Sequence, residues 1–464
     1  VTQKFHSSQT PWEIYQAIYP SSDVSFFLDS HDFHPPNQRY SYLGANPFMA
    51  VILGDGKLEI LKGHQKITKA PSELFSVLRG LFRRYRTPKR KYPPFFLGGA
   101  VGYWGYEMAA LFEKIKFKKG KNAKIPDLYL GFFRDLIVFD HRENIYWLVT
   151  HLLSRDGKLK GKKDKAEAAF DRLKGYFETN LQKPINFRLD HFKGEVSKAR
   201  FEQSVKRAQD YIAAGDIYQA NLSQRFSFSF KGSGLALYRA LRQINPSPFA
   251  SFLKIRDLEI VSSSPERLIQ KKDRFCLTQP IAGTRPRRMN GKNERTLARE
   301  LFRDEKERAE HLMLVDLERN DLGRVCQWPS VKVKSFMKIE KYSHVIHLVS
   351  DVVGKMRKNK DAFDLIRAMF PGGTITGCPK IRCMEIIDEL EPAKRGIYTG
   401  SIGWIDFKGD LDLNIVIRTI LLQKNRGYLQ VGAGIVHDSH PSREYEETLH
   451  KGEALVQALC EAGA

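Results

Sequence analysis

Two pairs of glutamates have the spacing expected of a divalent-cation site. Glu307 and Glu310 lie three residues apart in a segment with an apolar helical stripe, DEKERAEHLMLVDLERND, and Glu444 and Glu447 repeat this spacing in SREYEETLHK. Side chains three residues apart project from the same face of a helix. Mg²⁺ binds one or two carboxylates and leaves positions open for water and an anionic ligand. Each pair alone is typical of a solvated helix face, so a metal site requires the two helices to converge.

Two glycine-rich segments could bind an anion. FPGGTITGCPK ends with Pro379 near an expected helix start, where backbone N–H groups attract negative charge. In VGAGI, Gly432 and Gly434 would allow a ligand to approach the backbone closely. A tight loop packed beneath a sheet explains the first segment equally well, and neither segment identifies a ligand by itself.

Two charged residues interrupt or follow apolar runs. Arg418 stands within IVIRTI, which has the pattern of a strand, and a buried arginine there needs a carboxylate partner from the protein or from a substrate. Glu266 lies just after the apolar run LEIVSS, where burial would raise its pKa and suit it to general acid catalysis. The simpler explanation of Glu266 is an ion pair with the adjacent Arg267 or with another basic residue.

The elements that must position these residues fall into two parts. Short β-type runs and turns dominate residues 12–150, with one helix expected near 72–85, and this pattern predicts a mostly antiparallel layer. A proline-containing connector follows, and we place a domain boundary between residues 185 and 186. Beyond it come longer elements, including a helix expected over about 293–318. Hairpins with helices in separate blocks predict the α+β class.

One strand of the second part, IYQANLSQRFSFSF, alternates apolar and polar residues. Its even positions, including Tyr218, Ala220 and Leu222, form the apolar face. Successive side chains of a strand point to opposite faces, so Gln219 and Asn221 are expected to face the other way.

Composition excludes several classes of protein. The chain has 464 residues, 42% of them hydrophobic, which is enough for one large core or two ordinary ones. Its net charge of +23 is densest in lysine-rich stretches at 114–124 and 157–165, which lack the interleaved aromatic residues of a nucleic-acid platform. Five cysteines without CxxC spacing, no export signal and no long apolar run predict a cytoplasmic protein that binds neither nucleic acid nor membrane.

Taken in order, the segments of the second part resemble the chorismate-utilising family that includes anthranilate synthase component I and aminodeoxychorismate synthase component I. The resemblance covers nearly all of the chain from about residue 197. It rests on GDIYQANLSQRF, SPERL, PIAGTRPR, AEHLMLVDLERNDLGRV, HVIHLVS, FPGGTITGCPKIRCMEIIDELEP, YTGSIGW, IVIRTI, VGAGIVHDS and EETLHK. The first part is similar through FFLDS and RYSYLGANPF.

This resemblance implies a fold of the anthranilate synthase component I type, with two packed, mostly antiparallel sheets and helices on the outside. It implies an N-terminal domain over 1–185 and a chorismate-binding catalytic domain over 186–464.

The resemblance also implies roles for individual residues. Glu310 and Glu447 would bind Mg²⁺, supported by Glu307 and Glu444, and the metal would hold one carboxylate of chorismate. Glu266 would protonate the departing C4 hydroxyl. The remaining contacts would come from Arg418 and Tyr398 at the second carboxylate, His347 beside the ring, and Gly283, Thr284, Gly432, Gly434 and Lys451.

Gln219 indicates the nucleophile. Relatives that attack with water place a lysine base at this position, and glutamine cannot deprotonate water, so ammonia is the expected nucleophile. Ammonia is normally delivered by a glutamine amidotransferase subunit, and the chain contains no segment resembling one, which predicts a partner. A further expectation is tryptophan binding in the N-terminal domain near FFLDS and NPSPF.

Two products remain open. FPGGTITG and NPSPFASFL are more similar to the branch that makes 4-amino-4-deoxychorismate for 4-aminobenzoate and folate synthesis. AEHLMLVD, SHVIHLVS and Ala282 are more similar to the branch that makes anthranilate for tryptophan synthesis, because many aminodeoxychorismate synthases have a lysine at the position of Ala282 that forms a covalent intermediate. We favour the first branch.

Overall fold

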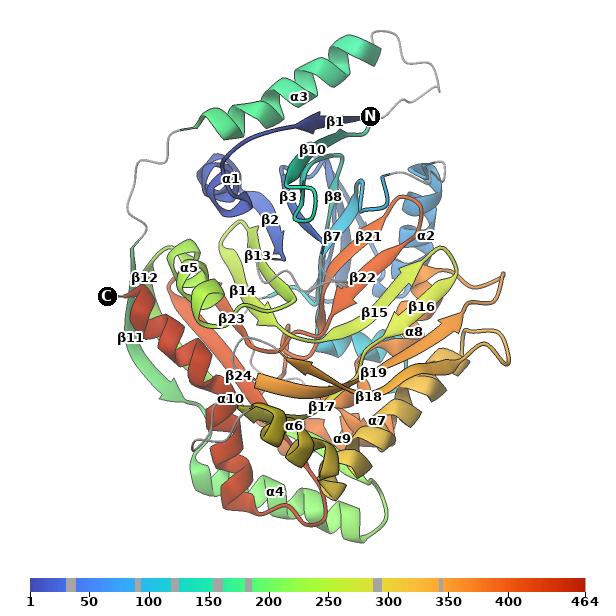
Figure 1. The fold of residues 1–464 in the computed structure, drawn as a ribbon, viewed down its shortest axis with the longest axis vertical. Helices are drawn as coiled ribbons and strands as arrows, with labels where there is room; N and C mark the ends of the chain where they lie inside the picture. Colours follow the sequence, from blue (N-terminus) through green and yellow to red (C-terminus); the bar gives the residue numbers. More distant parts are fainter. Residues whose placement is uncertain are drawn as a thin grey trace.

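A computed structural model describes residues 1–30, 39–87, 93–117, 125–152, 162–179, 186–286, 294–341 and 345–463. These residues form two twelve-stranded sheets in which all pairings are antiparallel, with helices around them (Figure 1). Most of the two lysine-rich stretches, at 118–124 and 157–161, lies outside the described residues.

The first sheet has the strand order β1-β10-β9-β3-β2-β13-β14-β23-β24-β12-β11, and β20 pairs with β12. Its strands are β1 (Thr2–Phe5), β2 (Val24–Asp29), β3 (Tyr40–Ala45), β9 (Asp135–Asp140), β10 (Ile145–Thr150), β11 (Phe187–Gly194), β12 (Gln219–Gly232), β13 (Phe249–Ile255), β14 (Leu258–Ser264), β20 (Gly377–Cys378), β23 (Thr419–Gln423) and β24 (Arg426–Ile435).

The second sheet has the order β17-β19-β16-β15-β22-β21-β7-β8-β4-β5-β6, and β18 pairs with β19. Its strands are β4 (Met49–Gly54), β5 (Lys57–Lys62), β6 (Gln65–Lys69), β7 (Gly99–Trp104), β8 (Leu128–Phe133), β15 (Arg267–Lys272), β16 (Phe275–Thr278), β17 (Ile281–Pro286), β18 (Lys332–Lys341), β19 (Val345–Lys355), β21 (Ser401–Asp406) and β22 (Leu411–Asn414).

The helices of the described residues cover the outer faces of the sheets. The α-helices are α1 (Pro11–Ile18), α2 (Leu74–Arg84), α3 (Lys162–Glu178), α4 (Lys198–Ala213), α5 (Gly234–Ile244), α6 (Glu294–Arg303), α7 (Glu305–Gly323), α8 (Ala362–Met369), α9 (Lys380–Leu390) and α10 (Pro441–Ala462). Short 3₁₀ helices occupy Tyr19–Ser21, Pro71–Glu73, Tyr106–Leu111 and Gly373–Ile375.

Apolar side chains fill three layers. Between the sheets, buried residues such as Phe26 of β2 and Val101 of β7 belong to one hydrophobic cluster. Outside the first sheet, α5 and α10 pack against β23 and β24 through residues that include Leu237 and Leu455. Outside the second sheet, α2, α7 and α8 form the third layer. Removal of this apolar surface from water is the main stabilising contribution to such a sandwich.

Both sheets contain strands from each side of residue 185. Strand β2 pairs with β13 in the first sheet, and β7 pairs with β21 in the second. The proposed boundary at 185/186 therefore crosses two continuous sheets, and the division into two domains stays a prediction.

Three local predictions are wrong. The helix expected over 293–318 is two helices, because Asp304 has an extended backbone and caps α7 by accepting a hydrogen bond from the Glu307 N–H at 3.1 Å. Tyr218, expected on the apolar face of β12, is 71% exposed, while Ala220 and Leu222 are buried. Arg418 lies outside the strands, in a bend between β22 and β23 with φ of +50°.

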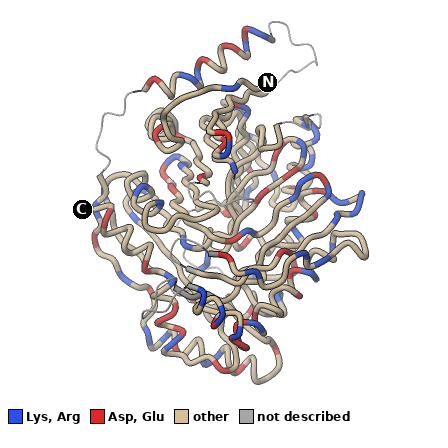
Figure 2. The backbone as a smooth tube through the Cα atoms, in the orientation of Figure 1, with Lys and Arg blue, Asp and Glu red and all other residues tan. Residues whose placement is uncertain are grey.

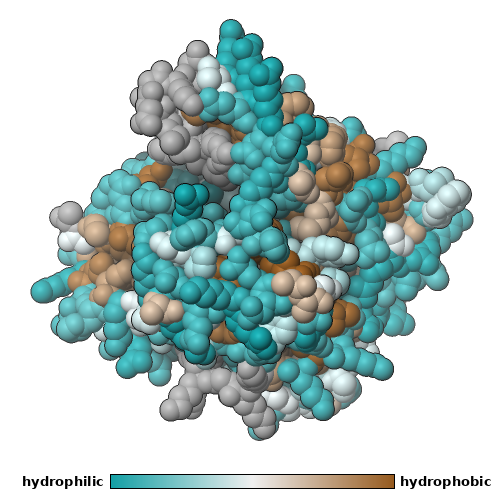
Figure 3. Space-filling view, turned by 90° about the horizontal axis from the view of Figure 1, so that it is seen from below, coloured by the Kyte–Doolittle hydropathy of each residue, from teal (hydrophilic) through white to brown (hydrophobic). Residues whose placement is uncertain are grey.

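The surface of the described residues carries both signs of charge. Figure 2 shows lysines and arginines interspersed with acidic residues along most elements. The face in Figure 3 is mainly hydrophilic, with hydrophobic residues in separate patches. None of the helices described has the length and apolar content needed to cross a bilayer.

Candidate active site

Two glycines of β24 form a ledge around which polar side chains gather. A Cβ atom on Gly432 would lie 2.7 Å from Asn221 Oδ1 and 2.9 Å from the Tyr398 hydroxyl oxygen. A Cβ atom on Gly434 would lie 2.5 Å from Gln219 Nε2 and 3.5 Å from Glu310 Oε1. Any larger residue would displace these groups, so the glycines let side chains from β12, α7 and the turn before β21 come together against β24. We call this the glycine ledge.

Two amide oxygens at the ledge are orphaned. Gln219 Nε2 donates a hydrogen bond of 2.9 Å to Glu310 Oε1, and Asn221 Nδ2 donates one of 3.2 Å to the Thr374 carbonyl. The other end of each amide, Gln219 Oε1 and Asn221 Oδ1, is buried and has no hydrogen-bond partner among the described residues. A buried acceptor without a partner is costly, so both oxygens are suited to a ligand that donates hydrogen bonds.

Glu266 is a buried acid at the start of β15. It is 4% exposed, and its Oε1 accepts a hydrogen bond of 3.4 Å from the Ile281 N–H. Burial raises the pKa of its carboxyl to about 8, against the lowering effects of the Thr374 hydroxyl and the Ile281 N–H. The nearby Glu318 carboxyl raises this pKa further. Glu266 is therefore protonated near neutral pH.

The ion pair expected between Glu266 and Arg267 does not form. Arg267 Nε lies 3.0 Å from Asp412 Oδ1 and its Nη2 lies 3.2 Å from Asp412 Oδ2. The two residues start a strand, and their side chains therefore leave opposite faces of the sheet. Glu266 keeps its proton because the neighbouring arginine pairs elsewhere.

Arg418 and His347 lie close to this acid. The positive charge of Arg418 lowers the pKa of Glu266 slightly and also acts on His347. His347 is 2% exposed, and burial followed by the charge of Arg418 lowers its pKa to about 3. Its Nδ1–H donates to the Gly283 carbonyl at 3.2 Å. The imidazole is thus neutral, and its Nε2 can only accept a hydrogen bond.

Gly283 places β17 beside His347 and Glu307. Its φ is +70°, which favours glycine, and a Cβ atom there would lie 3.0 Å from Glu307 Oε2. Thr284 follows in β17, and its backbone pairs with His347 of β19. The Thr284 side chain lies outside the described part of the chain.

The second ExxE pair borders the other side of the ledge. Lys451 Nζ donates to the Gly432 carbonyl at 3.2 Å and pairs with Glu447 Oε1 at 2.8 Å. Glu444 is buried, and burial raises its pKa, while Lys306 of α7 lowers it. Lys306 of α7 is therefore near enough for its charge to act on Glu444 of α10.

Carboxylates from α7 and α10 therefore approach the ledge from two sides, Glu310 at Gly434 and Glu447 through Lys451 at Gly432. Among the residues the structure describes, no three acidic, histidine or cysteine side chains are close enough to form a complete metal cage. Glu310 and Glu447 are the carboxylates that could hold a cation which takes few protein ligands and keeps waters, as Mg²⁺ does.

Residue spacing in the sequence does not indicate some of the residues at the site. Glu318, buried beside Glu266, has a pKa raised to about 7 by burial and by Asp321. Arg395 and Glu391 are charged residues in a segment that resembles an ordinary turn, yet Arg395 is 3% exposed. Asn221 could have been found, because it shares the polar face of β12 with Gln219.

A second cavity lies apart from the ledge, with a volume of about 840 Å³. FFLDS contributes Leu28, Asp29 and Ser30 to its lining, and NPSPF contributes Pro248 and Phe249. The two segments named for tryptophan binding thus line one cavity, because β2 pairs with β13. This volume is within the range of small-molecule sites.

The described residues thus bring together a buried acid, two ExxE pairs and a strand with two glycines, which is a candidate active site. The family model for chorismate binding enzymes matches residues 33–457, and the chain belongs to this family.

Curated relatives cover nearly the whole chain. Aminodeoxychorismate synthase component 1 of Bacillus subtilis (strain 168) is 42% identical over 426 residues, which are 91% of this chain and 89% of that protein. Anthranilate synthase component 1 of Acetivibrio thermocellus is 38% identical over 468 residues, which are 98% of this chain and 94% of that protein.

Solved structures agree on the fold. Anthranilate synthase component I from Streptococcus pneumoniae TIGR4 superposes with a TM-score of 0.80 and 34% identity, covering 91% of this chain and 93% of that one. The prediction of an α+β fold of the anthranilate synthase component I type is confirmed. The menaquinone-specific isochorismate synthase MenF from Escherichia coli has a TM-score of 0.73 at 17% identity, covering 99% and 94% of the two chains, and shares the fold.

Proposed function

We propose that the chain is a Mg²⁺-dependent enzyme that adds ammonia to chorismate. The observation that carries the proposal is Gln219, whose amide nitrogen lies beside Gly434, where hydration would need a water-activating base. Its amide oxygen is buried and has no hydrogen-bond partner among the described residues. An amide oxygen accepts hydrogen bonds but cannot remove a proton from water. Ammonia needs no such base, and its N–H groups match the orphaned acceptor.

In this proposal the ends of the substrate are held by opposite charges. Arg418 and the Tyr398 hydroxyl bind one carboxylate, and Lys451 and the glycine N–H groups contact the substrate from β24. Glu310 and Glu447 hold Mg²⁺, with Glu307 and Glu444 supporting them. The bound ion would neutralise and orient the second carboxylate.

Glu266 supplies the proton for the leaving group. As the C–N bond to ammonia forms and the C–O bond at C4 breaks, its proton passes to the departing hydroxyl, which leaves as water. The ammonium group of the adduct then loses a proton, and the Glu266 carboxylate is the nearest buried base. Neutral His347 beside the ring accepts a hydrogen bond without competing for this proton.

We favour 4-amino-4-deoxychorismate as the product, supported by FPGGTITG, by NPSPFASFL and by the 42% identity to the Bacillus subtilis protein. Anthranilate is the second candidate, and Ala282 favours it, since this buried position of β17 offers no amine for a covalent intermediate. The chain incubated with chorismate, Mg²⁺ and a high ammonium concentration decides between them. Anthranilate forming directly identifies the second candidate, and 4-aminobenzoate forming only after a lyase is added identifies the first.

A glutamine amidotransferase subunit would supply ammonia in the cytoplasm, which is the location we propose. "Component 1" in the names of the relatives supports such a second component. The second cavity is proposed to bind tryptophan.

Gln219→Lys tests the nucleophile. Lysine at this position would place a base at the ledge, so the variant is expected to form a small fraction of water-derived isochorismate that the unaltered chain does not form. Chromatography of products made in H₂¹⁸O measures it. Gln219→Met, similar in size and without a base, is the matched control, and a lysine variant that forms no ¹⁸O-labelled product contradicts the argument.

A further inference from the structure

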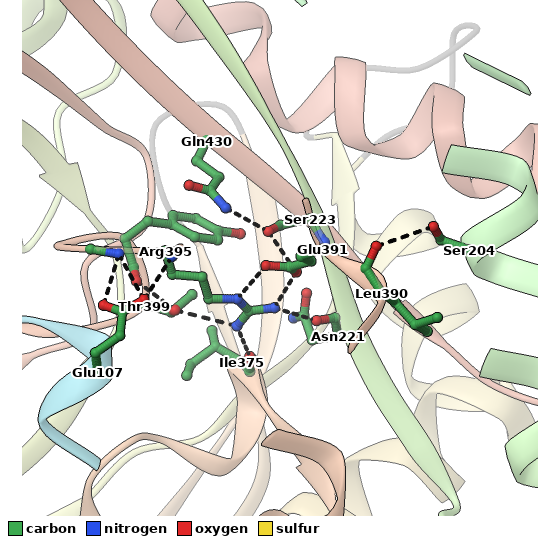
Figure 4. A network of polar contacts seen from close by, with 12 residues as sticks. Glu107, Ser204, Asn221, Ser223, Ile375, Leu390, Glu391, Arg395, Thr399 and Gln430 are labelled. Atoms are coloured by element: carbon green, nitrogen blue, oxygen red, sulfur yellow. Dashed lines mark hydrogen bonds and ion pairs between the residues drawn. The ribbon is translucent and has the colours of Figure 1, made fainter. Parts of the chain in front are cut away.

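Arg395 is buried at the back of the glycine ledge and uses all of its hydrogen-bonding capacity there. Its Nε and Nη2 donate to the two oxygens of Glu391 at 3.0 and 2.7 Å, as Figure 4 shows. Its Nη1 donates to the Ile375 carbonyl at 2.8 Å and to Thr399 Oγ1 at 3.3 Å. Its Nη2 also donates to the Asn221 carbonyl at 2.5 Å. A guanidinium has five N–H donors, and all five are satisfied.

These acceptors belong to separate segments of the chain. Asn221 is in β12, Ile375 is in the loop before α9, and Thr399 is in the turn before β21. They lie 174, 20 and 4 residues from Arg395. A single planar group thus fixes three segments of the folded chain. Its guanidinium carbon also lies 5.7 Å from the centroid of the Tyr398 ring.

Each segment carries a group of the proposed active site. Asn221 presents its orphaned Oδ1 to the Gly432 position. The segment at Ile375 carries Thr374, whose carbonyl accepts the 3.2 Å hydrogen bond from Asn221 Nδ2. Thr399 follows Tyr398, whose hydroxyl lies 2.9 Å from the Gly432 Cβ position.

Glu391, the counter-ion of Arg395, extends the hydrogen-bond network to Ser223 and Gln430. Glu391 Oε1 accepts hydrogen bonds of 2.8 Å from both the Ser223 N–H and the Ser223 hydroxyl, and Gln430 Nε2 donates to the Ser223 hydroxyl at 2.8 Å (Figure 4). Gln430 is on β24, two residues before Gly432. The network therefore ties the ledge strand itself to the arginine.

We propose that Arg395, neutralised by Glu391, is a positioning residue that sets the position of the carboxylate-binding Tyr398 relative to Asn221 at Gly432. This inference rests on the proposed function. Among the described residues, the acceptors of Arg395 include none of the proposed metal ligands, so it acts through the residues it holds. Lysine cannot replace it, because a single ammonium on a flexible stem has three donors and no planar fork.

Arg395→Lys is the test, with steady-state rates measured against chorismate at saturating Mg²⁺ and ammonium. We expect the KM for chorismate to rise roughly fivefold or more and kcat to fall about 100-fold, because reacting groups displaced by ~1 Å lose about that much rate. A merely structural role would reduce the amount of folded enzyme and hence the apparent kcat, but it would leave KM unchanged. An unchanged KM in folded protein overturns the proposal.

Arg79→Lys is the matched control. Arg79 of α2 is also bound to two carboxylates, at 2.6 Å to Asp361 and 3.1 Å to Asp364, but at the contact with α8. Its variant is expected to keep both kinetic constants.

Thr399→Val decides the question if Arg395→Lys does not fold, because it removes one acceptor and keeps the ion pair with Glu391. We expect a rise in KM of roughly threefold, and a KM equal to that of the unaltered chain overturns the proposal. Calorimetric titration with chorismate separates the proposed function of the chain from the positioning role of Arg395. If the unaltered chain binds chorismate without turning it over, the proposed function fails, while the ratio of dissociation constants between the variants still tests the positioning role.

Discussion

Glu266 and Arg267 are neighbours in the sequence and lie in two different surroundings. Glu266 lies beside Ile281 of β17, where burial keeps its carboxyl protonated, and no salt bridge involving it is found among the described residues. Arg267 lines the second cavity, where it is bound to Asp412. Other charges of that cavity are also paired, with Arg242 at 3.0 Å from Asp29 and Lys271 at 3.5 Å from Asp410.

This difference separates a reactive site from a binding site. A carboxyl whose pKa is shifted by burial can release a proton when the substrate requires it, whereas a carboxylate bound to arginine stays ionised over the working pH range. On this basis we expect proton transfer at Glu266, and we expect the second cavity to bind a ligand without chemical change.

The largest expected effect is at the acid. Glu266→Gln keeps the shape of the protonated carboxyl but cannot donate its proton to the leaving group, so kcat should fall by a factor of about 10² to 10⁴ with little change in thermal stability. Glu259→Gln is the matched control, a largely buried glutamate of β14 bound by Tyr19 and the Gly234 N–H away from the ledge. Retention of most of the activity by Glu266→Gln would exclude it as the acid.

A smaller effect is expected at the proposed metal site. Glu310→Gln removes a charge beside Gly434, so the Mg²⁺ concentration for half-maximal rate should rise by roughly 10- to 100-fold, the usual cost of disturbing a metal's surroundings. Titration of the rate with Mg²⁺ measures it, and Glu305→Gln, exposed on the same helix, is the control. If the half-saturating concentration does not move, Glu310 does not bind the metal.

The dependence of kcat on pH tests the assignment of Glu266 as the acid. Because the pKa of Glu266 is about 8, the proton is present below that pH and lost above it, so kcat per free ammonia should fall about tenfold per unit at higher pH. Glu318 favours the protonated form and Arg418 opposes it. His347, with a pKa of about 3, should add no limb between pH 5 and 7. A profile that rises through pH 9 would contradict the assignment.

The smallest effect belongs to the second cavity. Phe249→Ala should weaken tryptophan binding by roughly 2- to 12-fold, the value of one aromatic contact, without changing kcat in the absence of tryptophan. Calorimetric titration with tryptophan measures the change. Trp328→Ala, at a position 93% exposed and outside this cavity, is the control. No tryptophan binding by the unaltered chain would assign the cavity to another ligand.

The sequence by itself determined which side chains share a face. The ExxE spacing on α7 and α10, the alternation that turns Gln219 and Asn221 to one side of β12, and the glycines of β24 all follow from the periods of helix and strand. The resemblance to chorismate-utilising enzymes depended on these same segments, which explains why the family and the fold could be predicted before the structure was known.

Only the tertiary structure decided which of these faces meet. Gln219 and Glu310 are 91 residues apart, and Arg395 and Asn221 are 174 residues apart, so no local period relates them. The bend at Arg418 and the exposure of Tyr218 were mispredicted for the same reason, because both depend on partners outside their own segment. Burial and pairing are properties of the assembled sheets, and they convert Glu266 into an acid while leaving Arg267 ionised beside it.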